Sequence, residues 1–226
     1  MSRSDNDIRK DVLAELDWEP SLRNDDIAVA VRDGVVTLSG FADSYADKWR
    51  AERVTSGING VKAVANDIQV KLPSSSQRTD PDIARAAIDA LKWNISVPQD
   101  RIKVKVDSGW VTLEGDVDFY FQKQAAERAV RYLIGVKGVS NLISVRSTTK
   151  PSPAEVKQKI REALERSALY DADHIDVDVT GNKVILRGTV RSYSEWRDAE
   201  RAARNAPGVT EVENKVTIDP AVHAVA

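Results

Sequence analysis

Apolar residues recur at every fourth position in three separate stretches of the chain. These stripes are Ile8, Val12 and Leu16, then Ile83, Ala87 and Leu91, then Val156, Ile160 and Leu164. A spacing of four residues places the side chains on one face of an α-helix and predicts that this face is buried. A hydroxyl residue with an acid three positions later, the signature of a helix start, precedes each stripe at Ser4, Thr79 and Ser152.

A strictly alternating pattern follows each predicted helix. Every second residue is Ile or Val at 27–31, 102–106 and 175–179. Such alternation predicts a strand with one buried and one solvated face. A pair such as Asp33-Gly34 comes next, and it tolerates the positive φ of a tight turn. The predicted return strands cover residues 36–40, 111–115 and 184–188. Each stretch therefore predicts a β-hairpin.

A second helix and a last strand complete each stretch. The helix carries the tripeptide Ala-Glu-Arg at 51–53, 126–128 and 199–201. The strand carries a recurring asparagine, at Asn66, Asn141 and Asn214. Alanine permits close contact between helix and sheet, Glu and Arg can decorate the helix flank, and asparagine can bond to a neighbouring backbone. We interpret these recurring positions as structural rather than as ligand contacts.

The three stretches are copies of one module. A shift of 75 residues aligns the first with the second, and a further shift of 73 aligns the third, without internal gaps. The copies cover residues 4–72, 79–147 and 152–219, with linkers at 73–78 and 148–151 and a tail at 220–226. The predicted fold class is α+β, with three tandem αββαβ modules. Each module is a three-stranded mixed sheet covered on one face by two helices. Modules of this size have small cores, so we expect packing between copies to add to them.

The motifs resemble those of the BON family of bacterial proteins, in its OsmY-like form with tandem domains. The resemblance rests on the VTLxG strand ends at Val36–Gly40 and Val111–Gly115, on the Ala-Glu-Arg helix and on the Gly-Val-x-x-Val-x-Asn run at Gly60–Asn66. The third copy departs at Ile185, where the other two have threonine. The resemblance implies non-catalytic, stress-linked and often envelope-associated modules. It further implies binding of anionic phospholipid or chaperone-like protection, including in osmotic stress. One cytosolic member of the family, which joins this module to a LysM domain, binds potassium.

The residues that most enzymes need are scarce. The chain has no cysteine, which excludes disulfides and thiolate chemistry, and its histidines are His174 and His223. A net charge of −2 gives no basic field for nucleic acid. We therefore predict no enzymatic activity, no catalytic residue, no cofactor, no metal and no nucleic-acid partner. An acidic run at Asp171, Asp173, Asp176 and Asp178 has the oxygen ligands of a hard cation, but we interpret it as a solvated strand face.

The location follows from two absences in the sequence. No stretch approaches 18 apolar residues, so no transmembrane segment is predicted. The first ten residues, MSRSDNDIRK, lack the apolar core of a secretory signal. We expect a cytoplasmic protein, or a periplasmic one if the start of the chain is incomplete.

The middle copy differs from the others in ways that suggest a contact surface. Residues 79–147 hold 10 basic and 9 acidic residues, a net charge of +1, with Lys103 and Lys105 on the solvated strand face. Phe119 and Phe121 replace small residues of the first copy, and Trp110 adjoins the hairpin turn. Aromatic and lysine side chains suit an anionic phospholipid surface or a client protein. Two alternatives stay open: the phenylalanines fill a seam between copies, or the chain senses a small ion such as potassium. The ligand, the arrangement of the copies and the oligomeric state are also open.

Overall fold

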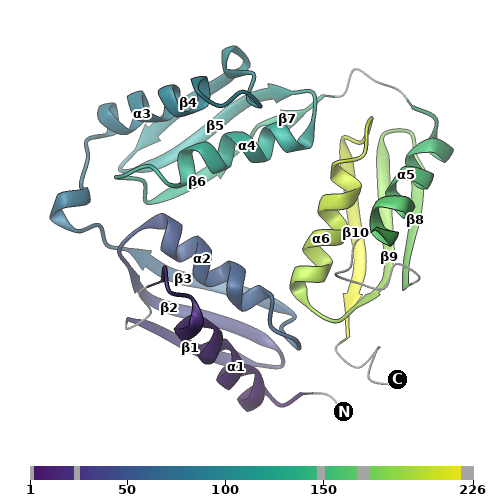
Figure 1. Cartoon of the computed structure of the whole chain (residues 1–226), viewed down its shortest axis with the longest axis horizontal. Helices are drawn as coiled ribbons and strands as arrows, with labels where there is room; N and C mark the ends of the chain where they lie inside the picture. Colours follow the sequence, from purple (N-terminus) through teal and green to yellow (C-terminus); the bar gives the residue numbers. More distant parts are fainter. Residues whose placement is uncertain (1–2, 23–25, 147–150, 167–173, 220–226) are drawn as a thin grey trace.

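The computed structural model describes residues 3–22, 26–146, 151–166 and 174–219. Within them the chain forms three αββαβ modules in succession (Figure 1). The predicted fold class is confirmed, because each module is a mixed sheet with two helices packed on one face.

The modules have closely matched elements. The first contains α1 (Asp5–Trp18), β1 (Ile27–Arg32), β2 (Val35–Ala42), α2 (Tyr45–Ser56) and β3 (Ala63–Val70). The second contains α3 (Asp80–Lys92), β4 (Ile102–Asp107), β5 (Trp110–Val117), α4 (Tyr120–Arg131), β6 (Gly138–Asn141) and β7 (Ser144–Val145), with short 3-10 turns η1 (Ser74–Ser76) and η2 (Gln99–Arg101). The third contains α5 (Pro153–Glu165), β8 (Ile175–Thr180), β9 (Lys183–Val190), α6 (Tyr193–Arg204) and β10 (Glu211–Ile218).

The return strand of the hairpin is the central strand of each sheet. In the first module β2 pairs antiparallel with β1 and parallel with β3, and the third module repeats this order with β8, β9 and β10. In the middle module the last strand is broken: β6 and β7 both pair with β5, and Leu142 lies between them. The second helix of each module is the crossover between the two parallel strands.

The predicted helix stripes are buried in three separate cores, one in each module. Ile8, Val12 and Leu16 are at most 2% exposed, and the equivalent residues of the other modules are equally covered. The recurring alanine is fully buried at Ala51, Ala126 and Ala199. The structural interpretation of this alanine is therefore confirmed: it allows the second helix to lie close against the sheet.

The recurring asparagine holds the second helix to the last strand. The side-chain nitrogen of Asn66 donates to the carbonyl oxygen of Lys48, and its side-chain oxygen accepts from the amide of Ile68. Asn141 and Asn214 make the same pair of bonds in their modules. The asparagine is thus a structural residue, as its recurrence suggested.

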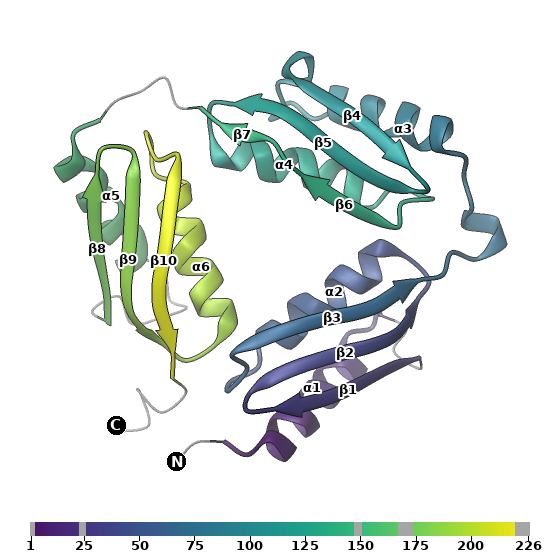
Figure 2. The same cartoon turned by 180° about the vertical axis from the view of Figure 1, so that it is seen from behind.

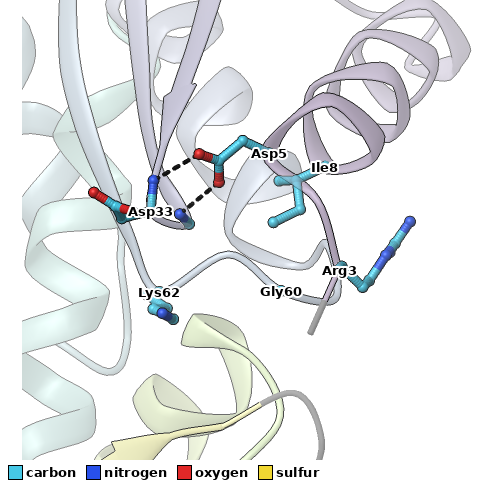
Figure 3. A pocket seen from close by; sticks show the side chains of 7 residues that line it. Arg3, Asp5, Ile8, Asp33, Gly60 and Lys62 are labelled. Carbon is cyan, nitrogen blue, oxygen red and sulfur yellow. Dashed lines mark hydrogen bonds between the residues drawn. The ribbon is translucent and has the colours of Figure 1, made fainter. Parts of the chain in front are cut away.

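An acidic residue at the start of the first helix braces the hairpin turn in two modules. The carboxylate of Asp5 accepts from the amides of Asp33 and Gly34 at 2.8 and 2.9 Å (Figure 3). Asp80 does the same for Ser108 and Gly109. The third module has proline at this position, and its turn is held instead by the Asn182 side chain, which donates to the carbonyl of Gly208.

The three modules form a ring whose inner side carries the second helices. Figures 1 and 2 show α2, α4 and α6 facing the middle, with β1, β4 and β8 toward the outside. One tyrosine, at the start of each second helix, contacts the next module. Tyr45 packs on the core of the middle module, and Tyr193 packs on the core of the first. Tyr120 lies near Arg204 of the third module, 5.5 Å from ring to guanidinium carbon.

The seam between the third and first modules closes the ring without a covalent link. The amide of Tyr193 donates to the carbonyl of Val61 at 3.1 Å, and α2 contacts α6. Burial raises the pKa of both Tyr45 and Tyr120, consistent with phenol groups withdrawn from water. Packing between copies, expected from the small cores, is therefore present.

Separate cores lead us to expect that residues 79–147 fold alone. The fragment keeps its own buried cluster and loses only seam contacts such as that with Tyr45. We expect native-like circular dichroism and a cooperative thermal transition at a lower temperature than in the full chain. A random-coil spectrum at low temperature would instead mean that the modules stabilise one another into a single folding unit.

Candidate functional site

Exposed apolar side chains are concentrated on the middle module. Of twelve large apolar side chains that are exposed among the described residues, nine belong to it. They are Ile88, Trp93, Ile95, Trp110, Phe119, Phe121, Tyr132, Ile134 and Leu142. The first module has Trp18, Val35 and Phe41, and the described part of the third has none. Such a concentration is typical of an interaction surface.

The two phenylalanines singled out in the sequence lie on the surface. Phe119 is 40% exposed and Phe121 47% exposed, and their rings stack with centroids 5.7 Å apart. The sequence-based expectation that at least one of them is partly exposed is confirmed. The residue between them, Tyr120, turns toward the third module instead.

Phe119 occupies a position where its residue type is unfavourable for the helix. It is the N-cap of α4, whereas Ser44 and Ser192 cap the equivalent helices and accept a hydrogen bond from a first-turn amide. A phenylalanine cannot make that bond, and serine is strongly preferred at this position. Gln122 compensates in part, because its side-chain oxygen accepts from the Phe119 amide at 3.0 Å. The middle module thus keeps an exposed aromatic ring at the expense of a better cap.

Other exposed apolar residues lie at the same end of the module as the phenylalanine pair. Arg101, just before β4, pairs with Asp116 near the end of β5 and with Asp118 just before α4. The segment that leads from α3 to this point carries Trp93 and Ile95, which are 86% and 102% exposed. Figure 1 shows the C-terminal end of α3 and the start of α4 at one end of the module.

The remaining predicted contact residues are spread along the open face of the sheet. Lys103 and Lys105 are exposed on β4, with Lys103 nearer the phenylalanine end. Trp110 begins β5 at the opposite end, roughly 23 Å from the end of that strand at about 3.3 Å per residue. Its indole nitrogen donates to the Ser140 hydroxyl at 2.8 Å, and its ring covers Gly138. The structure brings Phe119 and Phe121 together but separates them from Trp110.

Acidic neighbours offset much of the positive charge of this face. Glu114 lies directly opposite Lys103 in the hairpin. Asp116, which pairs with Arg101, has its pKa lowered chiefly by the hydrogen bond from that guanidinium. The apolar side chains, rather than the lysines, therefore distinguish this surface.

The acidic run of the third module is engaged in ion pairs where it is described. Asp176 pairs with Arg161, and Asp178 pairs with Arg187 and Lys157. Asp171 and Asp173 lie outside the described residues, as do His223 and the tail at 220–226. His174 is exposed just before β8. Among the described residues no group of three or more His, Asp or Glu side chains is placed to hold a metal ion.

A small pocket beside the first hairpin turn is a structural junction. It measures about 280 Å³ and is lined by Asp5, Gly60 and Lys62 among others. Figure 3 shows that Arg3 points away from the turn and that the Asp5 carboxylate is turned toward the backbone amides. With the Asp5 carboxylate bonded in this way, the pocket has no convergent set of ligand groups.

The arginine of the Ala-Glu-Arg motif has a position that the sequence did not predict. Arg53, Arg128 and Arg201 all line one cavity between the three second helices. The recurrence was visible in the sequence, but it was interpreted as decoration of a helix flank. The signal in retrospect is that the alanine and the asparagine have packing roles in every module, while each arginine is exposed.

Three tandem αββαβ units in one chain define a tandem-repeat protein built from small α+β modules. The model of the BON domain matches residues 4–71, 79–147 and 152–220. These matches cover most of the chain, which therefore belongs to the BON domain family. Within the described residues no helix is long and apolar enough to cross a bilayer.

Known proteins and structures share parts of this pattern. The chain is 31% identical over 141 residues to "Osmotically-inducible protein Y" of Escherichia coli (strain K12), across 61% of this chain and 70% of that protein. Two structures of CdsD, a structural protein of the type III secretion system of Chlamydia trachomatis, align with TM-scores of 0.27 at 15% and 14% identity. They cover 97% and 96% of this chain and 95% and 100% of their own chains. The family model and the Escherichia coli relative confirm the resemblance seen in the motifs.

Proposed function

We propose that this chain is a non-enzymatic binding protein with a stress-linked role at the bacterial envelope. Its middle module makes transient contact with anionic phospholipid. The proposal is carried by the concentration of exposed apolar side chains on that module, nine of twelve among the described residues. Similarity to an osmotically inducible protein supports the link to stress. A surface role is compatible with either face of the cytoplasmic membrane, so cell fractionation decides the compartment.

The composition of the surface sets the strength of binding. Burying one phenylalanine side chain contributes about 1.5–3 kcal/mol, and a lysine near an anionic membrane contributes about 1 kcal/mol. Because Glu114 opposes Lys103, we expect the apolar side chains to contribute most. Association costs reduce the total further. The result is weak and reversible binding that falls moderately as salt is raised.

The phenylalanine pair provides the decisive test. We expect the double change Phe119→Ser, Phe121→Ala to lower vesicle binding at least fivefold, because it removes the stacked rings. The serine also supplies the missing N-cap, so the helix should gain about 0.5–2 kcal/mol. Binding is measured by co-sedimentation with phosphatidylcholine vesicles, with and without phosphatidylglycerol, and stability by urea unfolding. A protein that loses binding while its stability rises cannot owe the loss to misfolding.

A second variant tests the opposite end of the module. Trp110→Val restores the residue type of Val35 in the first module and leaves the phenylalanine pair intact. We expect its vesicle binding to stay within twofold of the parent. Unchanged binding of the phenylalanine variant would refute the membrane proposal. Protection of a denatured client protein that depends on the same rings would then favour a chaperone-like role. A rise in melting temperature with potassium but not with sodium would favour ion sensing.

A further inference from the structure

A cavity of about 610 Å³ lies where the second helices of the three modules meet. All its lining residues belong to α2, α4 or α6, apart from Tyr132, which directly follows α4. Figure 1 shows these helices facing the middle of the ring. The volume falls within the range of about 300–1,000 Å³ that is usual for small-molecule sites. Of the nine exposed apolar side chains of the middle module, Tyr132 alone lines this cavity, and neither Phe119 nor Phe121 does.

The lining of the cavity has an excess of positive charge. Five arginines face three carboxylates, and the set is Arg53, Arg128, Arg131, Arg197 and Arg201 with Glu127, Asp198 and Glu200. Each module contributes the arginine of its Ala-Glu-Arg motif, so positive charge enters from three directions. Lys123, also on α4, has its pKa lowered by burial and then by repulsion from Arg204. Cations are thus crowded together where α4 and α6 meet.

Several guanidinium groups in the cavity have no carboxylate partner among the described residues, although Arg53 lies over the Trp49 ring, 5.6 Å from its centroid. Arg201 pairs with Asp198. Within the described part of the chain, by contrast, Arg53, Arg128 and Arg197 make no ion pair with a carboxylate. Like charges that line one cavity disfavour one another, so an arrangement of this kind gains stability when an anion binds between them.

Arg131 adds a buried donor that has no acceptor. Arg131 is only 7% exposed. Its Nη2 forms an ion pair with Glu127, but its Nε has no hydrogen-bond partner. The group is held in place because it stacks over the Trp49 ring of the first module, 3.9 Å from the centroid. An unsatisfied buried donor is unfavourable, and this one belongs to a residue that lines the cavity.

We propose that the cavity is a binding site for a small molecule that carries two or more phosphate groups. Arg53, Arg128 and Arg201 are its ligands. Guanidinium groups bind phosphate oxygens through paired hydrogen bonds, and three arginines on three modules match a ligand with several anionic oxygens. The rings of Tyr193 and Trp196, which stack on each other with centroids 5.7 Å apart, also line the cavity, and their cavity side is an aromatic surface for a base. Nucleotides combine both features, and a bound molecule would bridge all three modules.

The test is isothermal titration calorimetry of the full chain with pyrophosphate, ATP and adenosine in a low-chloride buffer. We expect saturable binding of pyrophosphate and ATP with one site per chain, and none of adenosine. The triple change Arg53→Gln, Arg128→Gln, Arg201→Gln should weaken binding at least tenfold. A matched control, Arg32→Gln, Arg85→Gln, Arg166→Gln, removes the same charge from exposed side chains outside the cavity and should leave affinity within twofold.

Two results would overturn the site. One is the absence of saturable binding of both pyrophosphate and ATP to the unmodified protein. The other is equal weakening in the two triple variants, which would mean a general charge effect. If the cavity variant loses its circular dichroism signal, the single change Arg128→Glu replaces it, with the same tenfold loss expected. The Phe119→Ser, Phe121→Ala variant should bind pyrophosphate normally, so failure of the membrane proposal and failure of this site are distinguishable.

Discussion

Substitution Gly40→Ala is expected to unfold the first module. Gly40 ends the VTLSG motif within β2 with φ of +116°, and an added Cβ would overlap the carbonyl oxygen of Asp26. Positive φ alone costs a non-glycine residue about 1–3 kcal/mol, and the overlap with rigid backbone adds to this. We expect a loss of about 3 kcal/mol or more. Small domains have about 0.05–0.15 kcal/mol of stability per residue, which gives a module of this size roughly 3.5–10 kcal/mol, so the loss removes about a third of this margin or more.

Hydrogen exchange measured by mass spectrometry locates the effect. Peptides from β1 and β2 should exchange much faster in Gly40→Ala, while those from the third module change little. Gly57→Ala is a control in the same module, because Gly57 has an ordinary helical φ of −78° and alanine there should alter stability by less than about 1 kcal/mol. Equal unfolding midpoints for Gly40→Ala and the parent would show that the strand end relaxes to accept a side chain.

The interior of each module was predictable because local pattern and packing agree. An apolar stripe with a period of four can be buried only on one side, and the hairpin turn carries residues that tolerate positive φ, such as Asp33 and Gly34. The glycine of the VTLxG motif also has a local cause, since the strand crosses a carbonyl of its own hairpin. These features depend on contacts within about 70 residues of chain. The sequence of one copy is therefore enough to predict these features, and the other two copies support the same prediction.

The arrangement of the modules was not predictable because its contacts join different copies. Tyr45, Tyr120 and Tyr193 recur at one position of the module, but recurrence within a copy does not reveal that each side chain reaches the next module. The meeting of Arg53, Arg128 and Arg201 in one cavity was not predicted for the same reason. An exposed, recurring arginine on a helix flank is usually solvated. Three such flanks come together only because the three modules are arranged in a ring.

The contact surface of the middle module was predictable only in part. Its aromatic residues were recognisable as additions when the copies were compared, and Phe119 and Phe121 are indeed exposed. Trp93 and Ile95 were missed, although they are more exposed than either phenylalanine. Trp93 follows the α3 stripe by two residues and Trp18 stands at the same place in the first module. A tryptophan repeated at a helix end suggests a packed side chain, and only the structure shows that Trp93 is exposed to solvent.

Substitution Tyr193→Ser is expected to open the ring. The seam between the third and first modules has no linker, and the Tyr193 ring packs there on the core of the first module. Losing this partly buried ring removes up to about 2 kcal/mol, which lowers the ratio of closed to open molecules by up to roughly thirtyfold. Small-angle X-ray scattering should show a larger radius of gyration, with each module still folded by circular dichroism. An unchanged scattering profile would mean that other contacts between α2 and α6 suffice to close the ring.

The equivalent change Tyr45→Ser is a control. It removes the same aromatic side chain from a seam whose two modules are joined by a linker. The first and middle modules are joined by residues 73–78, so they stay close even when this seam weakens, and we expect a smaller expansion.

Opening the ring also dismantles the cavity, because α6 moves away from α2. Tyr193→Ser should therefore weaken pyrophosphate binding more than Tyr45→Ser does, although neither tyrosine carries a positive charge. By linkage, saturating pyrophosphate should restore the compact form of Tyr193→Ser, since a ligand that binds only the closed ring stabilises that form by RT ln(1 + [L]/Kd). Compaction by pyrophosphate that also occurs in the cavity triple variant would contradict this coupling between ring closure and the arginine site.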